Sequence, residues 1–125
     1  MGKLESGKVM AFADRFEDLE IWREARRLNA EIHLCLVDCK DFDFRSQIRR
    51  AALSVMNNIA EGFERKTAKD FAHFLTIAKA SSGEIRSMTY AGQDIGIFHK
   101  ETAIRLRESY EILSKRISAF QRSLH

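Results

Sequence analysis

The sequence contains no proline and only six glycines among its 125 residues. A β-sandwich needs many tight turns and a proline-rich linker needs proline, so neither class fits this composition. Long helices joined by short connections tolerate the lack of proline best. Hydrophobic residues make up 45% of the chain and charged residues 31%, which is typical of one globular domain of ordinary size.

Long hydrophobic runs and disulfide frameworks are also lacking. No apolar stretch approaches the roughly 20 residues that a membrane-spanning helix needs, and no basic-then-apolar leader marks a secretory signal. The two cysteines, Cys35 and Cys39, are one helical turn apart and therefore do not form a disulfide framework. These features predict a cytoplasmic protein. Residues 1–15 show no sustained period and predict a loosely ordered leader, followed by one domain over residues 16–125.

From Phe16 onward, hydrophobic residues recur at helical spacings in four successive segments. The clearest repeat is in the last segment, where spacings of three and four residues alternate to the C-terminus. Its apolar positions are Ala103, Leu106, Tyr110, Leu113, Ile117, Phe120 and Leu124. Four amphipathic helices with short connections predict an all-α fold, an up-and-down antiparallel four-helix bundle.

Several residues are suited to the helix boundaries. Asp18 and Asp43 are expected to cap the first two helices, because a carboxylate accepts hydrogen bonds from free backbone N–H groups. Gly62 is expected to end the second helix and Gly96 the third, while Thr67 is expected to cap the start of the third. Small residues in the middle of the third segment predict the closest helix crossing there: Ala78, Ala80, Ser81, Ser82 and Gly83.

Motifs of enzymes and metal sites are missing from the sequence. A ferritin-like di-iron bundle needs Glu-x-x-His on two helices, and the nearest match is a single Asp70-Phe71-Ala72-His73. Cys35 and Cys39 lie in an apolar stripe, where free cysteine acts as a small hydrophobic residue. The chain also lacks a nucleophile elbow, a phosphate loop and a dinucleotide fingerprint. We therefore expect a non-enzymatic protein that needs no metal or cofactor.

The second segment carries a polar stripe between two apolar faces. A stripe in this position should be partly buried, so its groups should be hydrogen-bonded within the protein and fix the helix register. A ligand-binding role for the stripe is the alternative. The expected network is Gln47, Arg50, Ser54, Asn58 and Glu61, with Ser81 and Glu84 from the third segment.

The second apolar face of this segment runs through Leu53, Met56, Ala60 and Phe63. A helix that is apolar on two sides either lies in the centre of a bundle or contacts another subunit. Leu53, Met56 and Phe63 are therefore the candidate residues for an oligomer interface.

The net charge is only +3, but it is unevenly distributed. Residues 45–69 carry six basic and two acidic side chains, and residues 105–125 carry five and two. This asymmetry indicates either an anionic partner or an ordinary solvated surface. The candidates for phosphate contacts are Arg45, Arg49, Arg65, Lys66 and Lys69. Aromatic residues among these arginines are few, so base stacking should be minor.

Several stretches carry a resemblance to a known family. They are Phe16–Trp22, Gln47–Ser54, Asn58–Gly62, Arg65, Ile77–Ser81 and Glu84. Together they resemble the four-helix-bundle proteins first noticed in intervening sequences of bacterial 23S ribosomal RNA genes, over about residues 16–120. That family usually has proline where Met56 stands, so a more regular second helix is expected here.

The resemblance implies an up-and-down bundle that assembles into a homo-oligomer, with a homopentameric ring as the expected form. Gene context in the family implies an association with ribosomal RNA or the ribosome. The leading hypothesis is therefore an oligomeric bundle that binds structured RNA through basic surface. The alternative is a protein-interaction scaffold with no nucleic-acid role.

Overall fold

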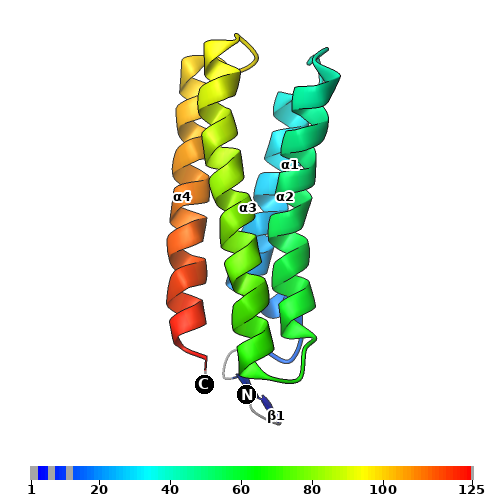
Figure 1. The fold of residues 1–125 in the computed structure, drawn as a ribbon, viewed down its shortest axis with the longest axis vertical. Coiled ribbons are helices and arrows are strands. Elements are labelled where there is room, and N and C mark those ends of the chain that lie inside the picture. The colour runs from blue at the N-terminus through cyan, green and yellow to red at the C-terminus, as the bar shows by residue number, and fades with distance from the viewer. Residues whose placement is uncertain (1–2, 6–7, 11–12, 125) are drawn as a thin grey trace.

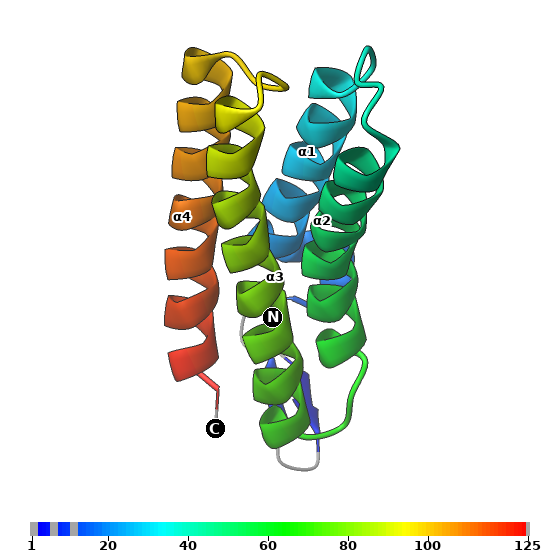
Figure 2. The ribbon, with the colours of Figure 1, turned by 45° about the horizontal axis from the view of Figure 1, so that its top comes forward.

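The computed structural model describes residues 3–5, 8–10 and 13–124. These residues form an antiparallel four-helix bundle (Figures 1 and 2). Its helices are α1 (Glu20–Cys35), α2 (Phe42–Phe63), α3 (Ala68–Asp94) and α4 (Lys100–Arg122). Successive helices are neighbours, and α1 closes the bundle against α4; contacts are most extensive between α2 and α3 and least between α1 and α4. The all-α, up-and-down fold expected from the sequence is confirmed.

A short hairpin and one 3₁₀ turn precede α1. Strands β1 (Lys3–Glu5) and β2 (Lys8–Met10) pair antiparallel, with Leu4 opposite Val9, and the turn η1 covers Phe16–Asp18. Figure 1 shows β1 at the end of the bundle where α2 connects to α3. The sequence analysis did not anticipate this hairpin. Residues 1–2, 6–7 and 11–12 of the expected leader lie outside the described residues, so its degree of order stays a prediction.

The periodic apolar positions form the core. Along α4, Ala103, Leu106, Tyr110, Leu113 and Ile117 are fully buried, as the alternating spacing predicted. Each such leucine or isoleucine contributes about 1.5–3 kcal/mol of burial free energy. Edge-to-face phenylalanine pairs then close both ends of the bundle: Phe44 with Phe98 at one end, and Phe71 with Phe63 and Phe120 at the other.

Two of the helix boundaries agree with the sequence-based expectation. Thr67 caps α3, and its hydroxyl oxygen accepts a hydrogen bond from the backbone N–H of Asp70 at 3.1 Å. Gly96 follows the end of α3 with φ +81°, a left-handed conformation that costs glycine nothing. Capping chemistry at this helix was therefore readable from residue type alone.

The expected N-caps of α1 and α2 are wrong. Asp18 belongs to the 3₁₀ turn η1, and Leu19 occupies the N-cap position of α1 without a side-chain cap. At α2, the carboxylate of Asp41 accepts from the backbone N–H of Phe44 at 3.0 Å. Asp43 lies in the first turn of the helix instead. Helix α2 begins earlier than expected because the extended backbone at Asp41 brings that carboxylate within reach of the first free N–H groups.

Glycine contributes close packing at two positions rather than helix termination. Gly62 is inside α2, which continues to Phe63, and a Cβ atom there would lie 2.9 Å from Cβ of Phe74. A Cβ atom at Gly92 would lie 2.5 Å from Cδ2 of Phe98. By contrast, a Cβ atom at Gly83 would meet nothing within 4 Å. Gly83 thus adds nothing to a close helix crossing, contrary to expectation.

Helix α2 runs without interruption through Met56, in line with the regular helix expected from the absence of proline there. Figures 1 and 2 both show it as one continuous ribbon. None of the helices in the described part of the chain combines the length and the apolar content needed to cross a membrane.

Candidate functional site

The five basic residues singled out from the sequence do not form one patch. Arg45 and Arg49 lie near the start of α2, whereas Arg65, Lys66 and Lys69 lie around the connection from α2 to α3. A helix rises 1.5 Å per residue, so Arg45 and Arg65 are separated by about 30 Å along α2. The structure therefore divides these residues between opposite ends of the bundle.

The three arginines of this set have partners within the protein. Arg45 donates to the carbonyl oxygen of Cys39 at 3.2 Å. Arg49 donates from Nε to Nδ1 of His33 at 3.0 Å, and burial together with this guanidinium lowers the pKa of His33 below its ordinary value. Arg65 forms an ion pair with Glu61 at 2.9 Å. These contacts orient the arginines along the protein surface.

The polar stripe of α2 is only partly joined into the expected network. The hydroxyls of Ser54 and Ser81 lie 2.7 Å apart, and the amide of Asn58 donates to the Ser54 hydroxyl at 3.0 Å. Gln47 donates to the carboxylate of Glu84. These contacts tie α2 to α3, as the register hypothesis requires.

Two members of the expected network stand apart from it. Arg50 is exposed and has no hydrogen-bonding partner among the described residues. Glu61 is also exposed, and its ion pair is with Arg65 on the same helix rather than with α3. Neither side chain therefore adds to the contacts between α2 and α3 among the described residues.

The expected oligomer interface needs one correction. Phe63 is only 2% exposed and packs edge-to-face against Phe71, so it belongs to the core. Met56 is partly buried against the core, and Leu53 is 42% exposed. The sequence could not separate the two apolar faces here because Phe63 lies at the border between them. Leu53 and Met56 remain as candidates.

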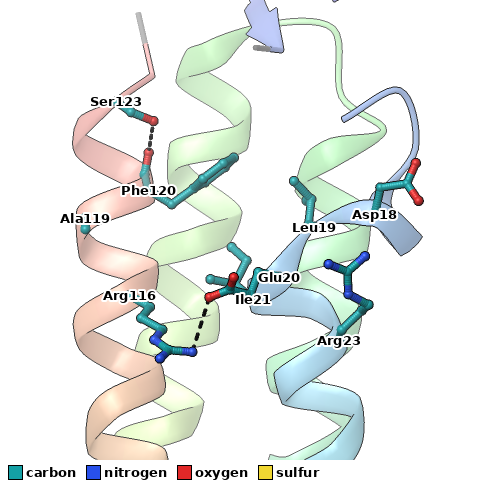
Figure 3. Close-up of a pocket in the computed structure, with 9 residues that line it drawn as sticks. All are labelled: Asp18, Leu19, Glu20, Ile21, Arg23, Arg116, Ala119, Phe120 and Ser123. Atoms are coloured by element: carbon teal, nitrogen blue, oxygen red, sulfur yellow. Dashed lines mark hydrogen bonds and ion pairs between the residues drawn. The ribbon is translucent and has the colours of Figure 1, made fainter. Parts of the chain in front are cut away.

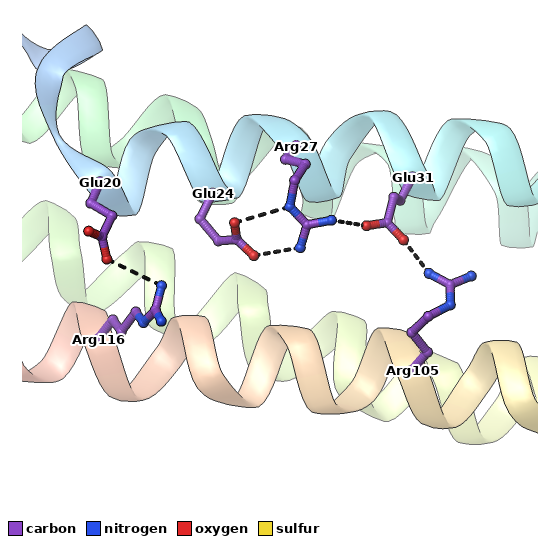
Figure 4. A network of polar contacts seen from close by, with 6 residues as sticks. All are labelled: Glu20, Glu24, Arg27, Glu31, Arg105 and Arg116. Atoms are coloured by element: carbon purple, nitrogen blue, oxygen red, sulfur yellow. Dashed lines mark hydrogen bonds and ion pairs between the residues drawn. The ribbon is translucent and has the colours of Figure 1, made fainter.

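A network of ion pairs joins α1 to α4, and Figure 4 shows it along the two helices. Arg27 pairs with Glu24 at 2.6 Å and with Glu31, and Glu31 also pairs with Arg105 of α4. Further along, Arg116 pairs with Glu20 at 3.2 Å. We call this region the α1–α4 seam, defined by Glu20, Glu24, Arg27, Glu31, Arg105 and Arg116.

The charges within the seam satisfy one another. The hydrogen bond from Arg27 lowers the pKa of Glu24, and the contacts with Glu24 and Glu31 raise the pKa of Arg27. A charge-assisted hydrogen bond to a carboxylate occupies the same donors that would otherwise bind a phosphate. The arginines of the seam are therefore poor candidates for an external anion.

A hollow of about 530 Å³ opens between the start of α1 and the end of α4. Figure 3 shows Leu19, Ile21 and Phe120 among its lining residues, with the Glu20–Arg116 ion pair across it. The hollow is mainly apolar and contains the Glu20–Arg116 ion pair, so it continues the seam. Arg23 also lines it and donates to the backbone carbonyl oxygen of Glu17 at 3.3 Å.

The opposite side of α4 has a different character. Two adjoining hollows of about 490 and 350 Å³ follow the line between α3 and α4, and both are bordered by Arg86 and Glu111. Four basic side chains and one acidic side chain are among the residues that line them. We call this region the α3–α4 groove, defined by Arg86, Tyr90, Arg107, Glu111, Lys115 and Arg122, with Gly83, Ser87, Ser114 and Ser118 as its small residues.

The arginines of the groove lack carboxylate partners among the described residues. Arg86 and Arg122 have no side-chain partner in that part of the chain. Arg107 has neutral partners only: its Nε donates to the hydroxyl of Thr89 at 3.0 Å, and its Nη2 donates to Oε1 of Gln93 at 3.2 Å. Lys115 does pair with Glu111, at 3.4 Å. The groove therefore keeps a net positive charge, whereas in the seam carboxylates neutralise the arginines.

Sequence reasoning missed this groove. The basic excess over residues 105–125 was visible, but nothing in the sequence distinguished the side chains facing α1 from those facing α3. A helical projection of α4 separates Arg105 from Arg107, because residues two positions apart differ by about 200° around a helix. The projection does not say which neighbouring helix each side meets: Arg105 pairs with Glu31 of α1, and Arg107 contacts Thr89 and Gln93 of α3.

Metal binding finds no support in the described residues: no cluster of three or more His, Cys, Asp or Glu is placed to hold an ion. Cys35 and Cys39 are free and partly buried at the edge of the core.

The fold and its surface define an antiparallel four-helix bundle whose last helix is charge-paired on one side and basic on the other. The family of 23S rRNA-intervening sequence proteins matches residues 17–119, which is most of the chain. The chain therefore belongs to this family, and the resemblance seen in the sequence is confirmed.

A solved structure is similar to this one. It is the crystal structure of a protein with unknown function from the S23 ribosomal protein family of Bacteroides thetaiotaomicron. The TM-score is 0.76 at 19% identity, covering 82% of this chain and 99% of the other. At this identity the likeness shows the fold alone. No curated protein matches the chain.

Proposed function

We propose that this protein is a non-enzymatic, homo-oligomeric bundle that binds structured RNA in the cytoplasm, with ribosomal RNA as the first candidate. The observation that carries the proposal is the α3–α4 groove, where Arg86, Arg107 and Arg122 lack carboxylate partners among the described residues. The description of the family as 23S rRNA-intervening sequence proteins supports ribosomal RNA as the anion.

The physical reason is the polyelectrolyte character of nucleic acid. Each phosphate bound by a lysine or arginine releases condensed counterions, so several unpaired cations in one line give salt-dependent binding. Arginine presents a planar fork of donors that matches phosphate geometry, and the hydroxyls of Ser87 and Ser118 in the lining of the groove add neutral donors. The same helix offers no such line on its α1 side, where carboxylates take up the donors.

Homo-oligomerisation would repeat the groove once per subunit. Leu53 and Met56 are three residues apart on α2 and form its candidate contact surface, which is separate from the α3–α4 groove. Subunits joined through it would leave every groove open, and a ring of five would present five grooves to one RNA. Linked weak sites bind with an avidity far above that of one site.

Filter binding of the purified protein to 23S ribosomal RNA fragments, titrated over a range of salt, tests RNA binding. We expect log K to fall linearly with log salt concentration. Arg86→Gln/Arg122→Gln should weaken binding, and Arg105→Gln/Arg116→Gln is the matched control, since it removes the same charge from the seam. Absent or salt-independent binding by the wild-type protein would overturn the proposal.

Light scattering on Leu53→Asp tests the oligomer. A buried aspartate at a subunit contact is costly, so we expect a lower mass than for the wild type. Ala80→Asp, at an exposed position on α3, is the control for an added surface carboxylate. An oligomer that forms but binds no RNA would favour the protein-interaction scaffold instead.

A further inference from the structure

Tyr90 and Arg107 form a stacked pair at one end of the α3–α4 groove. The guanidinium carbon of Arg107 lies 3.5 Å from the centre of the Tyr90 ring, and Tyr90 is 56% exposed. One face of the ring is therefore covered by a cation and the rest is open to solvent.

The pair is held in place from the α3 side. Arg107 donates to the Thr89 hydroxyl and to the Gln93 side chain, while Thr89 itself donates to the carbonyl oxygen of Arg86 at 2.6 Å. Two donor groups of the guanidinium are thereby used, and an arginine has five N–H donors. The remaining N–H groups have a fixed direction and no acceptor among the described residues. This arrangement is preorganised for an anion.

We propose that this pair binds an unpaired nucleotide of the RNA, with the base stacked on Tyr90 and the adjacent phosphate bound by Arg107 and Arg86. The inference rests on the proposed function and names its substrate class: single-stranded segments such as loops and bulges. Arg86 and Arg107 border the same hollow as Tyr90, so the ring and the two cations face one volume of about 350 Å³.

An unpaired base fits this site better than a duplex does. In a duplex each base face is covered by its neighbours, so one protruding ring has nothing to stack on. A splayed base offers a free face, and stacking on an aromatic ring is tolerant of sequence. The sequence analysis did not single out this pair, because Tyr90 lies 17 residues from Arg107 in sequence and comes next to it only in the fold.

A second arginine–aromatic pair supplies a matched control. Arg45 lies 4.7 Å from the ring centre of Phe42, which is 69% exposed, near the start of α2. Asp38, Asp41 and Asp43 surround that pair in sequence and are exposed, so the local field opposes a phosphate. Around Tyr90, Glu111 is the one acid among the residues lining the hollow, and Lys115 pairs with it.

Fluorescence anisotropy with two labelled RNAs tests the site: a single strand of about ten nucleotides and a blunt-ended duplex of equal length. Tyr90→Leu should weaken single-strand binding about five- to a hundredfold and leave duplex binding unchanged. Tyr90→Phe, which keeps the ring, and Phe42→Leu should both bind as the wild type does. Arg107→Gln should reduce the slope of log K against log salt by about 0.7, the share of one single-strand phosphate.

Arg107→Lys provides a second test of the site that leaves Tyr90 unchanged. It keeps the charge and loses the planar fork, so the salt slope should stay while the preference for the single strand falls. Wild-type affinity of Tyr90→Leu for the single strand would overturn the inference and leave RNA binding intact. A change of oligomeric mass in Tyr90→Leu with unchanged RNA affinity would also overturn it, since the groove would then join copies of the chain. Absence of binding by the wild type to either RNA would remove the proposed function itself.

Discussion

Helix α4 carries arginines on two sides, and they are paired with carboxylates on only one of them. Toward α1, Arg105 and Arg116 meet Glu31 and Glu20 and form the seam. Toward α3, Arg107 meets only a hydroxyl, an amide and a ring, while Arg122 has no side-chain partner among the described residues. Arg105 and Arg107 are two residues apart, yet one is part of an internal ion pair and the other belongs to the groove.

This contrast shows how little the net charge of a segment reveals. Both sides contribute to the same basic excess over residues 105–125, and only the register with the neighbouring helices divides it. Exposed ion pairs contribute about 0–1 kcal/mol each, so the seam adds specificity of helix pairing more than stability. An unpaired cation costs almost nothing on the surface and remains available to an external anion.

Reversing one charge on each side should give the largest difference. Arg86→Glu in the groove should lower RNA affinity at least about tenfold near 0.1 M salt, because it removes a cation and adds a repulsive carboxylate. Arg116→Glu makes the same change of net charge and should lower affinity far less, with a stability loss of about 1 kcal/mol or less opposite Glu20. Anisotropy and urea unfolding measure the two effects. Equal losses of affinity would break the distinction between the two sides.

Removing one carboxylate from the seam should lower stability, whereas removing one from the groove should raise RNA affinity. Both effects should be smaller than those of the charge reversals. Glu31→Gln releases Arg27 and Arg105, so the free energy of unfolding should fall by about 1 kcal/mol at low salt. The difference from the wild type should shrink as salt screens the wild-type ion pairs. Glu111→Gln should leave stability nearly unchanged and raise RNA affinity up to about fivefold at low salt, since an acid bordering the groove is gone. Weaker RNA binding by Glu111→Gln would contradict the assignment of the groove.

The pH dependence of the seam should give the smallest effect. The hydrogen bond from Arg27 holds the pKa of Glu24 below its ordinary 4.5 in the folded protein. A lowered folded-state pKa stabilises the protein above the unfolded value, and the contribution is lost as pH falls through the folded value. Glu24→Gln should therefore cost about 0.5 kcal/mol at pH 7, and its unfolding curve should converge with that of the wild type in acid. A difference that persists undiminished at acid pH would exclude this pairing as its cause.

Much of the fold could be read from the sequence because its signals are local. The alternating spacing of α4 predicted its buried face, and Thr67 and Gly96 marked helix ends through their own chemistry. The misplaced caps have a local cause too. Several aspartates surround the start of α2, and residue type alone did not decide between Asp41 and Asp43.

The site was less predictable because it depends on register between helices. Arg45 and Arg65 belong to one basic segment but lie at opposite ends of α2. Arg86, Tyr90 and Arg107 come from two helices, and only the antiparallel docking of α3 on α4 unites them. Phe63 could be placed in the core only once Phe71 was seen to pack against it.

The connection between α3 and α4 also bears on the order in which the protein folds. The backbone N–H groups of Ile97 and Phe98 both donate to the carbonyl oxygen of Gly92, and the Phe98 ring lies against that glycine. These contacts are close in sequence, so the loop between the two helices closes at low entropic cost. Among neighbouring helices, α1 and α4 have the least extensive contacts, and they are also the pair farthest apart in sequence. In native-state hydrogen exchange we therefore expect amides of α1 to open before those of α3 and α4, so that the groove survives in the partly unfolded molecule.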